Sequence, residues 1–214
     1  MSAALAHGIR PVDLFVRGAL PPPGSLLPLA ADATAVRADL LDELAIARQG
    51  SSIIAVYRAA DLPEERVDRS GPSLALAGIA DPGNLGTLVR SAAAFGASEV
   101  LLGDGCADAL GPRAVRASMG GIFGVPVHVV GDLESALADR RVVALDGAGP
   151  LTLLDADLSP PLTIVVGAER GGVPAGLLRR AEAVVRIPQD AAVESLNAAS
   201  AGTIALWEAA RRRG

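Results

Sequence analysis

The sequence predicts an α/β protein with a parallel sheet and helices on both faces. Short runs of β-branched and other apolar residues alternate with amphipathic segments along most of the chain, the pattern that βαβ units produce. The clearest unit has a buried strand at 73–80, a helix at 85–95 that Gly96 closes, and a strand at 98–105. Such a unit joins two parallel strands by a right-handed crossover.

Residues 1–60 predict a small α/β unit of their own. The sequence favours strands at 11–18 and 51–58, and an amphipathic helix at 33–45. The next stretch, 61–71, is charged and nearly devoid of apolar residues, and Gly71 precedes a proline. That composition is typical of a linker, so we expect the main domain to occupy residues 72–214.

After residue 105 the alternation continues to the end of the chain. The expected elements are a short helix within 111–121, a strand at 126–130, a helix at 132–140, strands at 141–147, 164–167 and 184–187, and a long C-terminal helix. The last two strands end abruptly in Gly or Pro, where the backbone must turn. Two strand ends and one helix start are thereby brought near each other.

Composition restricts the possible functions. The chain has 214 residues, 50% of them hydrophobic and 20% charged, so it is globular. Its net charge of −5 argues against a broad basic surface for nucleic acid. All 19 basic residues are Arg and aromatic residues make up only 2% of the chain. Any RNA recognition must therefore rest on a few local arginines and on shape.

Other composition signals exclude further classes. No apolar run is long enough to predict a membrane-spanning helix, and the N-terminus does not resemble a signal peptide. A lone Cys106 excludes an intrachain disulfide and favours a cytoplasmic location. His7 and His128 are far apart and lack partners at ligand spacing, so no metal site is expected.

The first motif is DPGNLGTLVR, at 81–90. It predicts a turn leading into a helix, with Asn84 as the N-cap and Arg90 nearly two turns further on. The motif lacks the third glycine of the dinucleotide fingerprint and the lysine of a P-loop. From spacing alone, a turn, a cap and a solvated arginine are the favoured explanation of this motif.

Two more motifs follow near the C-terminus. VVGAERGGVP places Glu169 at the carboxyl end of a strand, where open α/β sheets bind ligands, although a surface Glu in a Gly-rich loop is an equal alternative. IPQDAAVESLN places Ser195 at a helix start, as an N-cap, a site residue or both. Asn197 is less easily explained by packing. Glu169, Ser195 and Asn197, carried by two strand ends and a helix start, outline a small-molecule pocket.

In this order and spacing, the three motifs resemble the SpoU (TrmH-like) class of the SPOUT superfamily, which are RNA ribose 2′-O-methyltransferases. The matching residues are N-x-G-x-x-x-R, G-x-E-x-x-G and I-P-x(6)-S-L-N, supported by RASMGG at 116–121. The resemblance covers 73–213. Residues 1–60 resemble the later part of the ribosomal-protein-like RNA-binding domain that often precedes this fold.

The resemblance implies a C-terminal trefoil knot, a homodimer and S-adenosyl-L-methionine as cofactor. By position, Gly167, Ile187 and Leu196 would hold the cofactor. The implied catalytic residues are Asn84, Arg90, Glu169, Ser195 and Asn197. The sequence departs from the family at Gln189, where Met is usual, and at Arg170, where Gly is common.

The resemblance also implies a reaction, methyl transfer to a ribose 2′-hydroxyl of structured RNA. The separate N-terminal unit favours ribosomal RNA over transfer RNA. Because a guanidinium does not lose its proton in proteins, we expect Arg90 to bind the target phosphate and not to act as a base. Transfer RNA as substrate, and a non-catalytic RNA-binding protein with the same fold, remain alternative interpretations.

Overall fold

The computed structural model describes residues 1–18, 29, 31–44, 52–64, 70–190, 192 and 195–213. The chain divides into two compact units, Met1–Leu62 and Pro63–Gly214. Residues 65–69 of the expected linker lie outside the described part.

The first unit is built on a sheet with the order β2-β1-β3. The central β1 runs parallel to β2 and antiparallel to β3. Leu14, Val16 and Leu29 form its small buried core. The elements are α1 (Ser2–Ala6), β1 (Asp13–Arg17), β2 (Ala33–Val36), α2 (Ala38–Leu44), β3 (Ile53–Val56) and a 3₁₀ turn, η2 (Ala59–Asp61).

The predicted helix at 33–45 is wrong in its first part, because Ala33–Val36 forms β2. Thr34 and Val36 are β-branched and favour a strand once β1 offers an edge to pair with. The helix that follows is short and buries only Leu41 of its described residues, while Leu40 and Leu44 are exposed. The helix therefore lacks the broad buried face that an amphipathic helix was expected to have.

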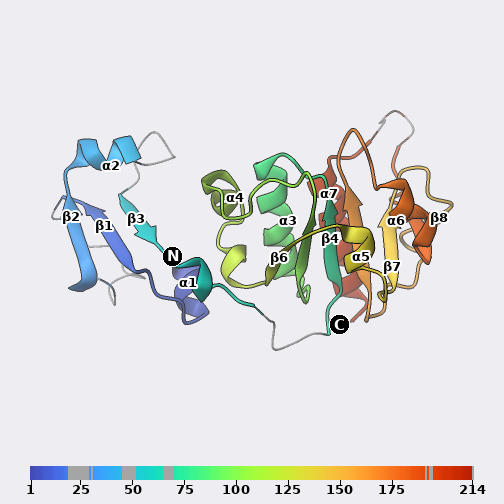
Figure 1. The fold of residues 1–214 in the computed structure, drawn as a ribbon, viewed down its shortest axis with the longest axis horizontal. Helices are drawn as coiled ribbons and strands as arrows, with labels where there is room; N and C mark the ends of the chain where they lie inside the picture. Colours follow the sequence, from blue (N-terminus) through green and yellow to red (C-terminus); the bar gives the residue numbers. More distant parts are fainter. Residues whose placement is uncertain are drawn as a thin grey trace. The chain divides into compact units, whose positions relative to one another are not determined.

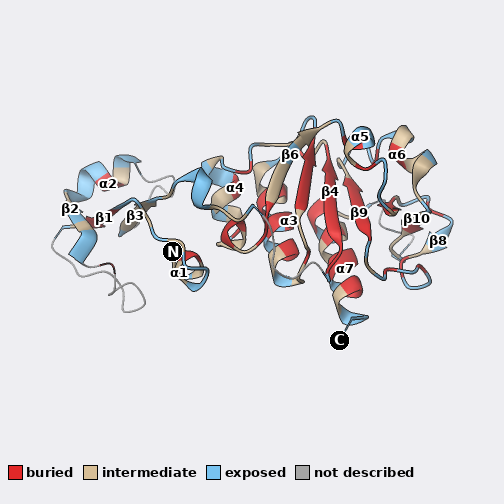
Figure 2. Ribbon diagram, turned by 60° about the horizontal axis from the view of Figure 1, so that its bottom comes forward, coloured by how far each residue is buried: buried red, intermediate tan, exposed pale blue. Residues whose placement is uncertain are grey.

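The second unit contains a seven-stranded sheet in the order β6-β5-β4-β9-β7-β10-β8, in which every pairing is parallel. The predicted parallel sheet is confirmed. Its strands are β4 (Ser73–Ala77), β5 (Val100–Gly103), β6 (Val127–Gly131), β7 (Val142–Leu145), β8 (Leu151–Thr152), β9 (Thr163–Gly167) and β10 (Ala183–Arg186). Figure 2 shows that the central strands are buried, as the five buried residues of β4 illustrate.

Helices cover both faces of this sheet (Figure 1). Val165 of β9 packs in a buried cluster with Leu133 and Leu177, from α5 and α6. The next residue, Val166, points to the opposite face, where a Cβ on Gly202 of α7 would lie 3.2 Å from its side chain. The helices are α3 (Pro82–Ala94), α4 (Pro112–Ala117), α5 (Leu133–Ala136), α6 (Ala175–Arg180) and α7 (Ala198–Arg211), with a 3₁₀ turn, η3 (Gly121–Phe123).

The strand order places β9 between two strands that precede it in the chain. β9 pairs with β4 along its whole length and with β7 along most of it. β10 likewise lies between β7 and β8. The last third of the chain is thus inserted into the sheet, and its turns meet at the carboxyl ends of β7, β9 and β10.

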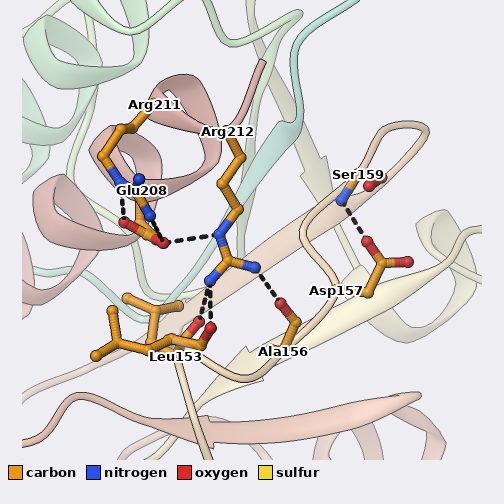
Figure 3. A network of polar contacts seen from close by, with 8 residues as sticks. Leu153, Ala156, Asp157, Ser159, Glu208, Arg211 and Arg212 are labelled. Atoms are coloured by element: carbon orange, nitrogen blue, oxygen red, sulfur yellow. Dashed lines mark hydrogen bonds and ion pairs between the residues drawn. The ribbon is translucent and has the colours of Figure 1, made fainter. Parts of the chain in front are cut away.

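The C-terminal end of α7 is fixed by a polar network (Figure 3). The Glu208 carboxylate, 2% exposed, accepts hydrogen bonds from Arg211 and Arg212. Arg212 also donates to the backbone carbonyls of Leu153, Leu154 and Ala156, in the connection between β8 and β9. Hydrogen bonds and charge from Arg211, joined by those of Arg212, lower the pKa of Glu208 from 4.5 to about 2.

Candidate functional site

The three sequence motifs meet at the carboxyl ends of the parallel strands. Asn84 lies in the first turn of α3, just after β4, and Glu169 lies two residues beyond β9. Asn197 lies at the start of α7. The carboxyl end of a parallel sheet is where ligands of open α/β folds bind, as the position of Glu169 predicted.

Two predicted helix caps are wrong. The N-cap of α3 is Asp81, whose carboxylate accepts from the Asn84 backbone N–H at 2.8 Å, with Pro82 at the first helical position. The N-cap of α7 is Asn197 and not Ser195. The first correction matters for the site because Asn84 keeps its side-chain amide free for other contacts. The second matters because it makes Asn197, a predicted site residue, the cap of α7.

The side chains of Asn84, Glu169 and Asn197 form a closed hydrogen-bonded triangle. Glu169 Oε1 accepts from Asn84 Nδ2 at 3.0 Å and from Asn197 Nδ2 at 2.6 Å. Asn197 Nδ2 also donates to Asn84 Oδ1 at 3.1 Å. One residue from each motif therefore contributes to a single cluster, although 113 residues separate Asn84 from Asn197.

The backbone of α7 sets the direction of every bond in this triangle. Asn197 Oδ1 accepts the backbone N–H groups of Ala199 and Ser200, so its Nδ2 must face Glu169 and Asn84. Because Nδ2 can only donate, Asn84 presents Oδ1 to it and turns its own Nδ2 to Glu169. A helix start thus orients two amides around one carboxylate.

A cavity opens beside the triangle, between the carboxyl ends of β7, β9 and β10 and the start of α7. Glu169, Gly167, Ile187, Ser195 and Leu196, all predicted from the sequence, line it. The structure thereby brings together every predicted cofactor-binding residue with two of the predicted catalytic residues.

Sequence reasoning missed one wall of this cavity. Leu145, Asp146 and Gly147, at the end of β7, also line it. Asp146 accepts the Ala148 backbone N–H through Oδ1 and so holds the turn. The Asp-Gly pair after an apolar strand was the available signal, since it marks a turn at the same sheet edge as Gly167.

Arg90 stands apart from the triangle and the cavity. It is exposed on α3, while Leu85, Leu88, Val89 and Ala92 are buried, as the sequence predicted. Among the residues that the structure describes, no carboxylate pairs with Arg90. Six residues of helix separate it from Asn84, or about 9 Å along the axis.

Other residues singled out in the sequence have structural roles or none. Cys106 is partly buried, its Sγ donates to the Leu76 carbonyl, and burial raises its pKa. Trp207 is 50% exposed, and its ring lies beneath the Arg211 guanidinium. The described residues contain no helix that could span a membrane and no metal-binding cluster of His, Cys, Asp and Glu.

Comparison with known proteins gives a consistent assignment. Residues 72–207 match the model of the SpoU rRNA Methylase family. A protein of Mycobacterium avium described as an uncharacterized tRNA/rRNA methyltransferase is 39% identical over 165 residues, which cover 74% of this chain and 53% of the relative. The chain therefore spans about half the length of the curated relatives it matches.

Solved structures show the same fold. The SpoU methyltransferase AviRb from Streptomyces viridochromogenes, solved with AdoMet, superposes with a TM-score of 0.84 at 28% identity, covering 99% of this chain and 86% of AviRb. A structure described as an RNA 2′-O ribose methyltransferase gives a TM-score of 0.84 at 30% identity, covering 99% of this chain and 84% of that one. With three motifs assembled at one sheet edge and a family match over most of the second unit, the chain belongs to the SpoU rRNA methylase family.

Proposed function

We propose that this chain is an S-adenosylmethionine-dependent RNA methyltransferase that acts on a ribose 2′-hydroxyl, with ribosomal RNA as its substrate in the cytoplasm. The observation that carries the proposal is the triangle of Asn84, Glu169 and Asn197 at the rim of the cavity. Family membership and the AdoMet found in AviRb support the cofactor. The relative described as an RNA 2′-O ribose methyltransferase supports the ribose target.

The cavity suits S-adenosylmethionine. Its walls include the apolar side chains of Leu145, Val166, Ile187 and Leu196, which fit an adenine ring and the aliphatic part of the methionine chain. Turns at Gly147 and Gly167 supply backbone groups for the hydrogen-bonding parts of the ligand. Gly167, Ile187 and Leu196 are the residues that we assign to holding it.

When bound, S-adenosylmethionine supplies an electrophilic methyl group on a sulfonium. The protein's contribution is alignment, because an in-line displacement depends on the geometry of its reacting groups. Glu169 holds the Asn84 and Asn197 amides, and Ser195 adds a hydroxyl at the same rim. We assign these four residues to binding the ribose and phosphate of the target nucleotide.

Arg90 has a different role in this proposal. A guanidinium stays protonated in proteins, so it cannot be the base that removes the ribose proton. Its fork of donors suits a phosphate, and its exposed position on α3 leaves it open to RNA. Arg90 would grip the target phosphate and polarise the hydroxyl, and the proton would leave late in the reaction.

Three further features belong to the proposal. The inserted segments after β9 and β10 would form the trefoil knot typical of the family, and the active protein would be a homodimer. The first unit would bind structured RNA. Its β2-β1-β3 sheet with α2 is the kind of small α/β unit that this role requires.

Calorimetry with S-adenosylmethionine and its demethylated product tests the cofactor. The wild type should bind both, and Leu196→Arg should abolish binding by filling the cavity. Leu154→Arg is the matched control, since Leu154 is 61% exposed and lies outside the cavity. Absence of binding by the wild type, with RNA present as well, would remove the enzymatic proposal.

Methyl transfer with a radiolabelled cofactor tests the target atom. Alkali cleaves RNA through the 2′-hydroxyl, so a ribose methylated there leaves the label in an alkali-resistant dinucleotide. Label released in mononucleotides would instead indicate methylation of a base. Parallel reactions with ribosomal RNA and bulk transfer RNA, compared at equal concentration, distinguish the two substrate classes.

A further inference from the structure

Apart from Arg180, Arg186 and Arg213, which donate to backbone carbonyls, the described arginines of the second unit fall into two groups. Those with carboxylate partners are Arg140, Arg141, Arg211 and Arg212. In the described residues of this unit, no carboxylate pairs with Arg90, Arg113, Arg116, Arg170 or Arg179. Two of the arginines in this second group, Arg113 and Arg116, share the short helix α4, and the function proposed above gives them no role.

One side of α4 packs on α3 and the other side is exposed. Ala114 is buried, and a Cβ on Gly86 of α3 would lie 2.3 Å from its carbonyl oxygen. Arg113 and Arg116 are exposed, and a spacing of three residues puts them on one side of a helix. Met119 follows two residues after the end of α4 and is 70% exposed.

This side of α4 adjoins Arg90. The chain from α4 to η3 follows α3, because Gly121 approaches the backbone of Arg90 so closely that a Cβ there would lie 2.8 Å from its Cα. Contacts at Gly86 and at Arg90 therefore hold the segment in place at both ends. The backbone segments that carry Arg90, Arg113 and Arg116 therefore lie next to each other.

Helix stability explains only one of these residues. Arg113 lies in the first turn of α4, where the helix dipole disfavours a cation; only Arg116, in the last turn, gains from it. Met119 has a φ of 50°, a left-handed conformation that is uncommon outside glycine. A strained, exposed methionine beside two unpaired cations points to a ligand.

We propose that Arg113, Arg116 and Met119 bind the backbone of the substrate RNA next to the nucleotide held by Arg90. The two guanidinium groups contact neighbouring phosphates, and Met119 packs on a sugar or base. The surface is local, which fits a protein whose net charge is −5. This inference rests on the proposed function, since it extends the RNA-binding surface of the same site.

The salt dependence of RNA binding tests the arginines. The probe is a fluorescently labelled ribosomal RNA stem-loop, titrated between 50 and 200 mM KCl. The slope of log K against log salt is negative, and each lost contact to a duplex phosphate should make it shallower by about 0.9. The double variant Arg113→Ala/Arg116→Ala should therefore have a slope shallower by about 1.8. Arg179→Ala, an exposed arginine on α6 across the sheet, should leave the slope unchanged.

Met119→Gly tests the apolar contact. Glycine adopts positive φ without strain, so the variant should keep the melting temperature of the wild type. RNA affinity should nevertheless fall by about fivefold, comparable to the loss of one weak base contact. Unchanged affinity would remove Met119 from the surface.

The outcomes separate this inference from the function on which it rests. An unchanged slope in the double variant, or an equal decrease in Arg179→Ala, overturns the α4 surface. Cofactor affinity and sedimentation of the double variant should match those of the wild type, and a change in either would make the arginines structural. RNA binding with the predicted slopes but without methyl transfer would overturn the enzymatic function and leave the surface standing.

Discussion

Asn197 serves two parts of the structure at once. Its Oδ1 caps α7, and its Nδ2 donates to Glu169 and Asn84. Any substitution at this position therefore changes a helix start and a candidate catalytic cluster together. A side chain that keeps one role and loses the other can separate them.

Asn197→Asp is that substitution. Aspartate is as good an N-cap as asparagine, so stability should change by less than about 1 kcal/mol. A carboxylate oxygen would, however, replace the donor that lies 2.6 Å from Glu169 Oε1, and two such carboxylates cannot both ionise easily. Methyl transfer should fall by at least ~100-fold at neutral pH, comparable to the loss of one positioned donor.

Two observations check this interpretation. The Asn197→Asp rate should recover in part as pH falls, because a shared proton restores a donor between the two carboxyl groups. Asn197→Ala should instead lose about 1 kcal/mol of stability in chemical denaturation and gain nothing at low pH. Wild-type activity in Asn197→Asp, with a loss only in Asn197→Ala, would mean that Asn197 matters only as a cap.

Arg90 allows a cleaner separation, because its side chain is exposed and α3 takes its core contacts from other residues. Arg90→Ala should change the free energy of unfolding by less than about 0.5 kcal/mol. It should leave cofactor affinity intact and lower methyl transfer by at least ~100-fold.

Arg90→Lys identifies the kind of contact. Lysine keeps the charge but loses the planar fork that binds a phosphate through two bonds. Single-turnover rates should therefore stay close to those of the alanine variant. Recovery of most of the activity would show that a point charge is enough, and full activity of Arg90→Ala would leave Arg90 a solvated helix residue.

At the scale of single residues, sequence reasoning identified the members of the site better than their local roles. Asn84 and Asn197 were both expected near the site, yet the caps were assigned to Asn84 and Ser195. Asp81-Pro82 was the overlooked signal, since Pro favours the first helical position and an Asp before it favours the cap. The triangle itself depends on tertiary contacts that no local pattern contains.

At the scale of secondary-structure elements, the turn after β9 brings two backbone segments of the cavity wall very close together. Gly172 N–H donates to the Ala168 carbonyl at 2.8 Å, which closes the loop that carries Glu169. A Cβ on Gly167 would lie 2.0 Å from the Gly172 carbonyl carbon. A side chain at this position therefore forces the loop to open.

Gly167→Ala should lower cofactor affinity and destabilise the protein by about 1–3 kcal/mol, the typical cost of overpacking. Gly171→Ala, four residues on in the same loop, is the control, because a Cβ there meets open space. Calorimetry and denaturation of both variants make the comparison. Similar losses in the two would show that the loop is sensitive to any substitution and that the close approach is unimportant.

The network at the end of α7 makes a separate prediction about pH. The pKa of Glu208 is lowered from 4.5 to about 2, so the carboxylate contributes stability that is complete above pH 4.5 and is lost as pH falls towards 2. Glu208→Gln should lose about 1.5–3 kcal/mol at neutral pH, as for a hydrogen bond to a charged group. Unfolding of the wild type and the variant should then converge between pH 4.5 and 2.

Element prediction worked where one pattern dominated and failed where two competed. The apolar runs of β4, β5 and β9 have flanking glycines and are buried, and they were placed correctly. Residues 33–45 carry a helical spacing that continues through β-branched Thr34 and Val36, and the pairing with β1 decided the outcome. β8 has two residues, too few for any periodicity.

For the whole molecule, the proposed homodimer depends on surfaces that a single chain leaves uncovered. Trp207 is 50% exposed on α7, although a tryptophan in an apolar helix is usually covered. We expect the protein to sediment as a dimer at micromolar concentration. Trp207→Glu should shift it towards monomer and lower methyl transfer, whereas a monomeric wild type would contradict the proposal.

The alternation of apolar strand segments with amphipathic helical segments predicted the fold class, but it did not predict the strand order. Nothing in the β9 sequence specifies that it pairs with β4 and β7, since its apolar residues suit any interior position of a parallel sheet. The cavity depends on that order, because it sets β7, β9 and β10 side by side.

The position of β9 also has a consequence for the synthesis of this protein. A ribosome releases β4, β5 and β6 long before Thr163–Gly167, the residues of β9. Until β9 is made, the side of β4 that will pair with it is an open sheet edge. Pairing between segments so far apart in the chain is slow to form. The nascent chain therefore carries an apolar, unpaired edge from the synthesis of β4 until that of β9, and we expect chaperones to engage it during that interval.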